Sequence, residues 1–401
     1  MSGAKTARTM LLVLIGAFAL SQAYRTIAGV MAPALQADLL LSAGQLGVVA
    51  AMFHFVFGAM QLFMGAGIDF YGVRRVLLAV FPLTVLGALL STLAPGYGML
   101  LVGQGLIGMG CAPAFLACSV FIAQRFPVDR FAAISGITLG LGSLGMVLTA
   151  SPLAWIIEAS SWRAGFAVLT ALSAASWVAL WAWLRLDPPT RNQGESLPDV
   201  LHGFLRLFLL PHTWGIVLLG IMVYASIMAL RGLWLGPLLV ERQGLSLVQA
   251  GDVALAMSLL MILGAPVLGR LDPGRRWRRS ALVGATLLLA ALFMLLALRA
   301  TLPVAIGVPL VVGVLSSYTI WQYADVRDAY PSRLLGRAIG LFTMSMFLGV
   351  ALMQALTGWV AGWAQAAAID PYAAVFLVIA GLLAAGALAF ALLPAPPSDS
   401  H

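Results

Sequence analysis

Long apolar stretches separated by short polar connections make up most of this chain. A helix needs about 20 apolar residues to cross the hydrocarbon core of a bilayer, and twelve windows of the sequence meet that requirement. We expect membrane spans at residues 10–34, 45–68, 76–94, 98–124, 131–157, 164–184, 213–240, 250–269, 280–298, 302–324, 335–363 and 371–393. The pattern therefore predicts an all-α membrane protein with twelve transmembrane helices.

A long polar connection divides these windows into two groups of six. It covers residues 185–212 and contains the run Asp187-Pro188-Pro189. Proline lacks a backbone donor and ends helices, so we expect a linker here. The sequence therefore predicts an N-terminal six-helix bundle at residues 1–184 and a C-terminal six-helix bundle at residues 213–401.

The two predicted bundles repeat one another. Residues of the first half recur in the same order and at one constant spacing in the second half: Pro33 and Pro237, Ser42 and Ser246, Gln45 and Gln249, Gly47 and Gly251, Gly136 and Gly340, and Trp155 and Trp359. Such regularity indicates an internal repeat. Because each half has an even number of spans, both enter the membrane in the same orientation, which predicts pseudo-symmetry about an axis along the membrane normal.

Composition and charge agree with a membrane location. Of the 401 residues, 62% are hydrophobic and 9% are charged, which places the chain in a lipid bilayer. The net charge of +8 comes from arginines in short connections, so we interpret it as topology and expect no nucleic-acid partner. Since cytoplasmic loops are rich in Lys and Arg, we expect both termini and the linker on the cytoplasmic side of a bacterial inner membrane.

A turn rich in glycine and charge, residues 65–75, connects the second and third windows. Its glycines allow a tight reversal. The run resembles the loop signature of the major facilitator superfamily of transporters, with Gly67, Phe70 and Val73 departing from that pattern. Together with the twelve windows, the resemblance covers essentially the whole chain. It implies that the loop acts as a latch on the cytoplasmic side through Gly65, Asp69, Gly72, Arg74 and Arg75. The second half has a shorter loop that begins at Asp272.

Polar side chains inside the spans are costly and usually face a bundle interior or an aqueous cavity. The amide, imidazole and guanidinium side chains well inside the windows are Gln22, Arg25, His54, Gln61, Gln104, Arg231, Gln322 and Gln354. The third, sixth, ninth and twelfth windows contain none of these. We therefore expect those four helices to face lipid and the others to line a central path, which is also the arrangement of the superfamily.

Two arginines at similar depths in the first and seventh windows suggest a site for an anion. Arg25 and Arg231 each offer a planar fork that suits carboxylate or phosphate. Tyr24-Arg25 followed by Pro33 resembles the first span of superfamily members that carry organic phosphates. Pro237 follows Arg231 after only six residues, which turns Arg231 partly away from Arg25. The alternative is that an arginine reaches the membrane interface or binds backbone carbonyls.

These observations predict a substrate-binding set on the helices of the central path. Its members are Arg25, Arg231, Gln22, Tyr24, His54, Tyr224, Gln104, Gln322 and Gln354. His54 is a candidate proton site or substrate contact, and a histidine that bonds a neighbouring helix is the alternative. Carboxylates lie at span ends or in loops, which argues against a proton-coupled cation exporter. We expect no metal or other cofactor.

The sequence favours a secondary active transporter that works by alternating access on a small organic anion, as a monomer. An efflux carrier for a drug-like or siderophore-like compound is the main alternative. Pairs such as Met257 and Met261 permit a copper importer, and the glycine-rich fifth window permits a nitrate or nitrite carrier, although Ser143 stands where those carriers have asparagine. No catalytic motif of a known class occurs, so we do not expect an enzyme.

Overall fold

The computed structural model describes residues 2–185, 203 and 205–396, and within these ranges every regular element is a helix. The first half contains α1 (Ser2–Tyr24), α2 (Ile27–Leu39), α3 (Ala43–Val80), α4 (Pro82–Thr92), α5 (Tyr97–Cys111), α6 (Ala114–Arg125), α7 (Val128–Leu148), α8 (Ser151–Ala159) and α9 (Trp162–Trp183). The second half contains α11 (Pro211–Ala229), the π-helical η1 (Leu230–Trp234), α12 (Leu235–Pro237), the π-helical η2 (Leu238–Arg242), α13 (Leu247–Arg270), α14 (Gly274–Leu298), α15 (Leu302–Leu315), the 3₁₀ helix η3 (Ser316–Tyr318), α16 (Thr319–Ala329), α17 (Ser332–Ala366) and α18 (Pro371–Leu392).

Twelve stretches of the described helices are long and apolar enough to cross a membrane. This confirms the predicted all-α membrane fold and its number of spans. Several predicted windows differ from the helices that form; the fourth and fifth, for example, are each divided into two helices, α5 and α6, and α7 and α8. The first window is two helices, because the chain turns at Arg25 and Thr26 between α1 and α2. The second window ends too early, because α3 continues through most of the predicted loop.

The predicted reversal at residues 65–75 is concentrated at one residue. Gly72 has φ 82° and ψ 158° inside α3, and helical backbone continues on both sides of it. This is a conformation that only glycine adopts without strain. Residues 65–71 are therefore helical, and Gly72 alone carries the change of direction that the sequence assigned to the whole loop.

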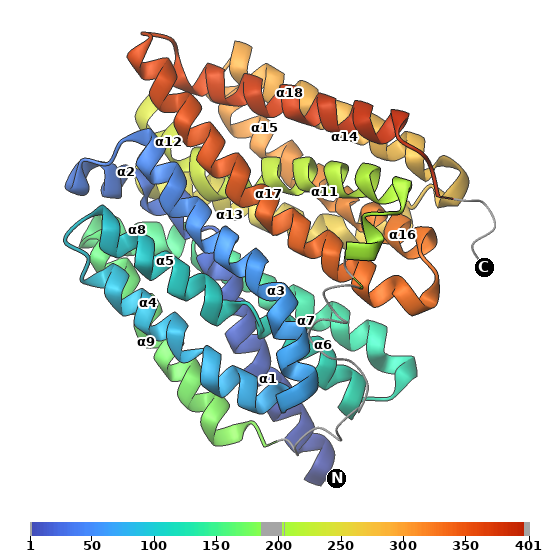
Figure 1. The fold of residues 1–401 in the computed structure, drawn as a ribbon. Coiled ribbons are helices and arrows are strands. Elements are labelled where there is room, and N and C mark those ends of the chain that lie inside the picture. The colour runs from blue at the N-terminus through green and yellow to red at the C-terminus, as the bar shows by residue number, and fades with distance from the viewer. Residues whose placement is uncertain (1, 186–202, 204, 397–401) are drawn as a thin grey trace.

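Figure 1 shows α1–α9, blue to green, gathered on one side of the molecule and α11–α18, yellow-green to red, on the other. In the same view α1 begins and α18 ends at the same end of the bundle, which we call the termini end. The opposite end, which we call the far end, carries α2, α8 and the start of α13. Most of the predicted linker at 185–212 lies outside the described residues, so the domain boundaries remain a prediction.

The sequence repeat produces matching structure at the far end. Ser42 caps α3 and Ser246 caps α13, each by accepting the amide of the glutamine three residues on, while that glutamine accepts the cap amide. This reciprocal cap satisfies donors that the first helical turn leaves free. One turn further along α3 and α13, Gly47 and Gly251 approach the other half so closely that an added Cβ would lie 2.6 Å from the Gln354 carbonyl oxygen and 3.0 Å from Ser151 Cα, respectively.

Candidate functional site

The guanidinium of Arg25 lies against a pair of aromatic rings, one from each half. Its central carbon is 4.8 Å from the centre of the Phe57 ring on α3 and 4.7 Å from that of Phe347 on α17. Arg25 is 9% exposed, and its Nε has no hydrogen-bond partner. In the described part of the chain no side chain forms an ion pair or hydrogen bond with it. The two ring centres are only 4.4 Å from each other, so both rings approach the guanidinium from the same side, and N–H groups away from the rings remain for a ligand.

Other polar groups near Arg25 have unused hydrogen-bonding capacity. His54 lies within electrostatic range of Arg25, and the Gln354 amide lies beside the His54 ring. The Nδ1 of His54 is 3.2 Å from the Ala50 carbonyl oxygen, but its Nε2 and both amide atoms of Gln354 lack partners. Buried polar groups are normally hydrogen-bonded. A cluster of unsatisfied ones therefore marks a place where water or a ligand is bound.

Arg231 is held differently. It lies in η1 and is 1% exposed. Its Nε donates to Ser258 Oγ at 3.0 Å, and its Nη2 donates to the carbonyl oxygen of Met146 at 3.1 Å. That carbonyl is available because the chain breaks between α7 and α8, where the Ala150 amide bonds Val147 instead. Arg231 thus joins the second half to the first, although its Nη1 has no partner.

The structure therefore separates the predicted pair of arginines. Arg25 contacts α3 and α17, whereas Arg231 contacts α13 and α7. Each arginine reaches the second span of its own half and the fifth span of the other, so the two point to opposite sides of the contact between the halves. A shared site made by both guanidiniums, as the sequence suggested, is not what the structure builds.

Four further predicted residues each have their own surroundings. Tyr24 packs inside the first half, with its hydroxyl 3.0 Å from Ser173 Oγ on α9, and not on the central path to which the sequence assigned it. Gln104 is buried in α5, which packs against α3 and α4. Gln22 donates to Ser143 Oγ on α7 at 3.4 Å. Gln322 is buried in α16, and both of its amide atoms lack partners.

A cavity of about 750 Å³ lies between the halves, towards the termini end. It is lined by Gly136, Leu139, Gly140, Ser143 and Met146 of α7, Tyr224 and Ile227 of α11, Met261, Ile262, Leu263, Ala265, Pro266 and Gly269 of α13, and Ser316, Ser317, Thr319, Ile320 and Tyr323 of η3 and α16. The Tyr224 ring lies 5.4 Å from that of Phe347, which in turn covers Arg25. Of the predicted set, only Tyr224 lines this cavity directly.

The predicted gating loop makes a contact within its own half. Arg74 Nε donates to the carbonyl oxygen of Leu184, just after α9, at 2.6 Å. Asp69 lies three residues before Gly72, and Gly65 lies one turn before Asp69 on the same helix. Arg75 is exposed. A latch function for this loop stays a prediction.

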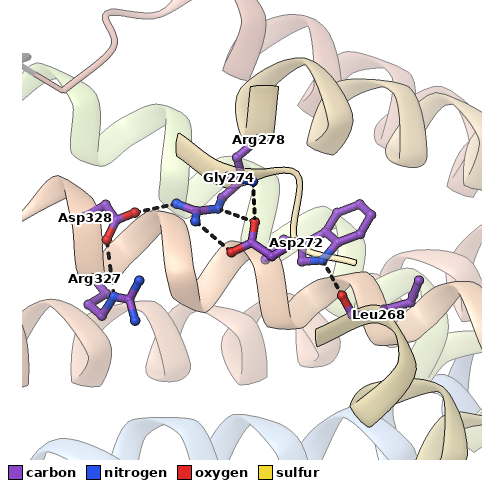
Figure 2. Close-up of polar contacts among 7 residues, drawn as sticks. Leu268, Asp272, Gly274, Arg278, Arg327 and Asp328 are labelled. Carbon is purple, nitrogen blue, oxygen red and sulfur yellow. Dashed lines mark hydrogen bonds and ion pairs between the residues drawn. The ribbon is translucent and has the colours of Figure 1, made fainter. Parts of the chain in front are cut away.

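The corresponding loop of the second half forms an ion-pair network that the sequence did not predict (Figure 2). Arg278 is 3% exposed; it donates to Asp272 through Nε at 3.0 Å and Nη2 at 2.8 Å, and to Asp328 through Nη1 at 2.5 Å. Arg327 Nε donates to Asp328 at 3.2 Å. The Asp272 carboxylate also accepts the amide of Gly274 at 3.1 Å. Asp272 was visible in sequence, but its partner Arg278 lies on α14, and the second partner of Arg278, Asp328, lies on α16.

Among the described residues, no group of three or more His, Cys, Asp or Glu lies close enough together to hold a metal ion. Cys111 and Cys118 are buried free thiols. The methionine pair noted in the sequence divides between a buried side chain, Met257, and one on the cavity wall, Met261.

Comparison with known proteins gives consistent results. The family model of the Major Facilitator Superfamily matches residues 13–326. Curated relatives include a probable sulfoacetate transporter of Cupriavidus necator (28% identical; 43% of this chain, 40% of the relative), a hexuronate transporter of Bacillus subtilis (25%; 60% and 58%) and an enterobactin exporter of Escherichia coli (30%; 61% and 58%). The matches thus span between two-fifths and three-fifths of these relatives.

Solved structures with the same fold include a bacterial homologue of the human lysosomal transporter Spinster in an inward-facing, unoccupied conformation. Its TM-score is 0.73 at 16% identity, covering 96% of this chain and 95% of the other. A nucleoside transporter, NupG, has a TM-score of 0.76 at 15% identity, covering 96% and 99%. At these identities the likeness concerns the fold alone.

Proposed function

The chain belongs to the major facilitator superfamily, and from this premise we propose that it is a secondary active transporter that moves a small organic anion by alternating access. The observation that carries the proposal is the guanidinium of Arg25, buried against Phe57 and Phe347 and, among the described residues, without a carboxylate partner. Removing a charge from water costs several kcal/mol, whereas a cation–π contact returns about 0.5–2 kcal/mol. An anion that binds Arg25 would offset the part of the desolvation cost that the rings leave uncompensated.

The surroundings support an anion in particular. The free amide of Gln354 can donate to a carboxylate or sulfonate held by Arg25, and a neutral His54 can do so through Nε2 in one tautomer. Two of the relatives are named for organic anions, sulfoacetate and hexuronate, while the third is named as an exporter of enterobactin. Because each matches this chain over part of its length, these names support the charge of the substrate and not its identity.

Alternating access is supported by the difference between the two ends of the bundle. At the far end the halves are joined by hydrogen bonds from Ser151 to Asp252 at 2.5 Å and from the Val248 amide to Glu158 at 3.0 Å. The large cavity lies towards the termini end. With the predicted topology in a bacterial inner membrane, this arrangement corresponds to a carrier closed outside, with its cavity on the cytoplasmic side.

The test is transport by the purified protein in liposomes. A set of carboxylates and sulfonates is compared with the corresponding neutral amides and with organic cations. We expect accumulation of one or more anions, unchanged in chemistry, and its loss in Arg25→Gln at equal protein content. Transport confined to cations or neutral compounds would contradict the proposal.

A second candidate is the efflux of a larger amphipathic compound, which the size and apolar wall of the cavity favour. Vesicles of both orientations separate the candidates, because an exporter loads inverted vesicles and an importer loads right-side-out ones. The direction of transport changes the physiological role but leaves the assignment of Arg25 intact.

A further inference from the structure

Two features of the central region restrict what the carrier can hold. One is the single guanidinium that remains available at Arg25, and the other is the nearly apolar wall of the adjacent cavity. We infer that the substrate is an amphipathic monoanion: one carboxylate or sulfonate that binds the edge of Arg25, joined to an aryl or branched alkyl body that fills the cavity. The inference rests on the proposed function and narrows its substrate class.

The number of charges follows from the two arginines. Arg231 already uses its Nε and Nη2 on Ser258 and the Met146 carbonyl oxygen, and it points to the other side of the contact between the halves. Of the described residues that line the cavity, none is charged. A second negative charge on the substrate would therefore be desolvated without a counter-charge, which costs several kcal/mol. One charge matches one guanidinium.

The nature of the body follows from the cavity wall. Leu139, Ile227 and Leu263 present aliphatic surface, which gains free energy when an apolar body covers it. The hydroxyls of Ser316 and Ser317 already donate to the carbonyl oxygens of Gly313 and Met261, at 2.7 and 3.1 Å. They offer few free donors to a polyhydroxylated body, which would lose its hydrogen bonds to water without replacement.

Arg25 does not itself line the cavity, but residues next to it connect the charged and apolar parts. Phe347 covers Arg25 with one face and meets Tyr224, a cavity residue, ring to ring at 5.4 Å. One turn before Arg25, Gln22 donates to Ser143, which also lines the cavity. Tyr323, which lines the cavity from α16, lies within electrostatic range of Arg25. A molecule with its acid group at Arg25 therefore has its body directed to the apolar wall.

The experiment compares five probes that separate charge from body. Four are 4-phenylbutyrate, its neutral amide, gluconate and the neutral amide of gluconate, and the fifth is phenylsuccinate, a dianion. Binding to the full chain in detergent is measured by thermal shift and by intrinsic fluorescence. We expect 4-phenylbutyrate to bind at least about tenfold more tightly than each of the other four, and Arg25→Gln to remove that preference for the acid over its amide.

A matched pair of variants tests the body. Leu139 and Leu141 lie on α7 and are 43% and 38% exposed, but only Leu139 lines the cavity. Leu139→Gln should weaken 4-phenylbutyrate by about fivefold or more, since an amide then faces the apolar body, and Leu141→Gln should change it less than twofold.

The outcomes distinguish failure of the amphipathic-monoanion inference from failure of the proposed anion transport. Gluconate or phenylsuccinate binding more tightly than 4-phenylbutyrate, in an Arg25-dependent way, would overturn the amphipathic monoanion and leave the anion carrier standing. Equal effects of the two leucine variants would also overturn the proposed position of the body. If the acids and amides bind alike and Arg25→Gln changes nothing, the anion carrier itself is wrong.

Discussion

Arg25 and Arg231 occupy similar depths in the first and seventh spans, but their guanidiniums make different contacts. Arg231 finds a hydroxyl and a main-chain carbonyl oxygen, so most of its hydrogen-bonding capacity is used within the protein. Arg25 contacts two phenylalanine rings and, among the described residues, no hydrogen-bond acceptor. The two halves thus each supply an arginine, while the neighbouring helices decide whether it joins the halves or remains available to a ligand.

The difference has a local structural origin. Near Arg231, the break between α7 and α8 frees the Met146 carbonyl oxygen from its usual helical bond. The helix that faces Arg25 from the other half, α17, runs unbroken from Ser332 to Ala366, so its carbonyls stay inside the helix and only a side chain, Phe347, can meet the guanidinium. An arginine that faces a continuous helix therefore finds no free main-chain carbonyl oxygen, whereas one that faces a helix break does.

Removing the Arg25 guanidinium should have the largest effect. Arg25→Gln should lower anion transport by about 100-fold, because it removes a charge-assisted, two-pronged contact worth about 1.5–3 kcal/mol per bond. Arg25→Lys keeps the charge without the planar fork and should lower it by about tenfold. Uptake into liposomes at matched protein content measures both. A normal melting temperature for Arg25→Gln is part of the expectation, since no internal hydrogen bond is lost.

Arg231→Gln should affect the far end instead of the substrate. Losing the bond to Met146 should favour opening between the halves by about tenfold, the scale of one charge-assisted hydrogen bond. A cysteine introduced as Ala254→Cys, beside Arg231, reports this as faster modification by a thiol reagent, over a low background because Cys111 and Cys118 are buried. Anion affinity should stay within threefold; a large loss of affinity would place Arg231 in the substrate site after all.

Phe347 should influence the return of the carrier without substrate. Its ring belongs to the second half and covers a charge of the first, so it helps the halves close over Arg25 when no anion is bound. Phe347→Leu should slow net uptake by about fivefold and leave exchange of labelled for unlabelled anion nearly unchanged. Phe342→Leu, a buried neighbour on α17 that packs on Tyr323, is the control. An equal fall in net uptake and exchange would refute this role.

The network in the second half should contribute to stability by a smaller amount. Hydrogen bonds from Arg278 hold the pKa of Asp272 below its usual range. A lowered native pKa stabilises the fold above the unfolded value of about 3.9, and the gain is lost as the pH falls through the native pKa. Asp272→Asn should cost about 1 kcal/mol at pH 7.

Unfolding curves between pH 7 and pH 3 measure this cost. The difference between Asp272→Asn and the wild type should shrink as the pH falls below about 3.9. Arg276→Gln, in the same loop, should show no such difference, because its guanidinium stacks on Trp277. A difference for Asp272→Asn that stays constant from pH 7 to pH 3 would assign its effect to packing instead of charge.

Much of the fold could be predicted because the length of an apolar stretch is a strong local signal. The repeat was readable for a similar reason: Ser42 and Ser246 make their caps with residues only three positions away. The turn at Arg25 and Thr26 gave no such signal. The continuation of α3 to Gly72 was missed because glycine is compatible with both a helix and a turn.

The candidate site could be predicted only as a set of polar positions. Arg25, His54 and Gln354 stood out because polar side chains are rare inside spans. Phe57 and Phe347 carried no signal, since phenylalanine is common in membrane helices and its value here comes from contact with Arg25. The commitment of Arg231 to Met146 also lay beyond the sequence, because it depends on a main-chain carbonyl oxygen freed in another helix.

The central claim is that Arg25 binds the substrate anion while Arg231 serves the structure. The most direct measurement is the anion-induced rise in melting temperature of the wild type, Arg25→Gln and Arg231→Gln, each titrated with 4-phenylbutyrate and with its neutral amide. A ligand that binds the native fold raises its melting temperature. The account predicts a rise with the acid in the wild type and in Arg231→Gln, and none in Arg25→Gln. A rise that survives in Arg25→Gln and disappears in Arg231→Gln would contradict it.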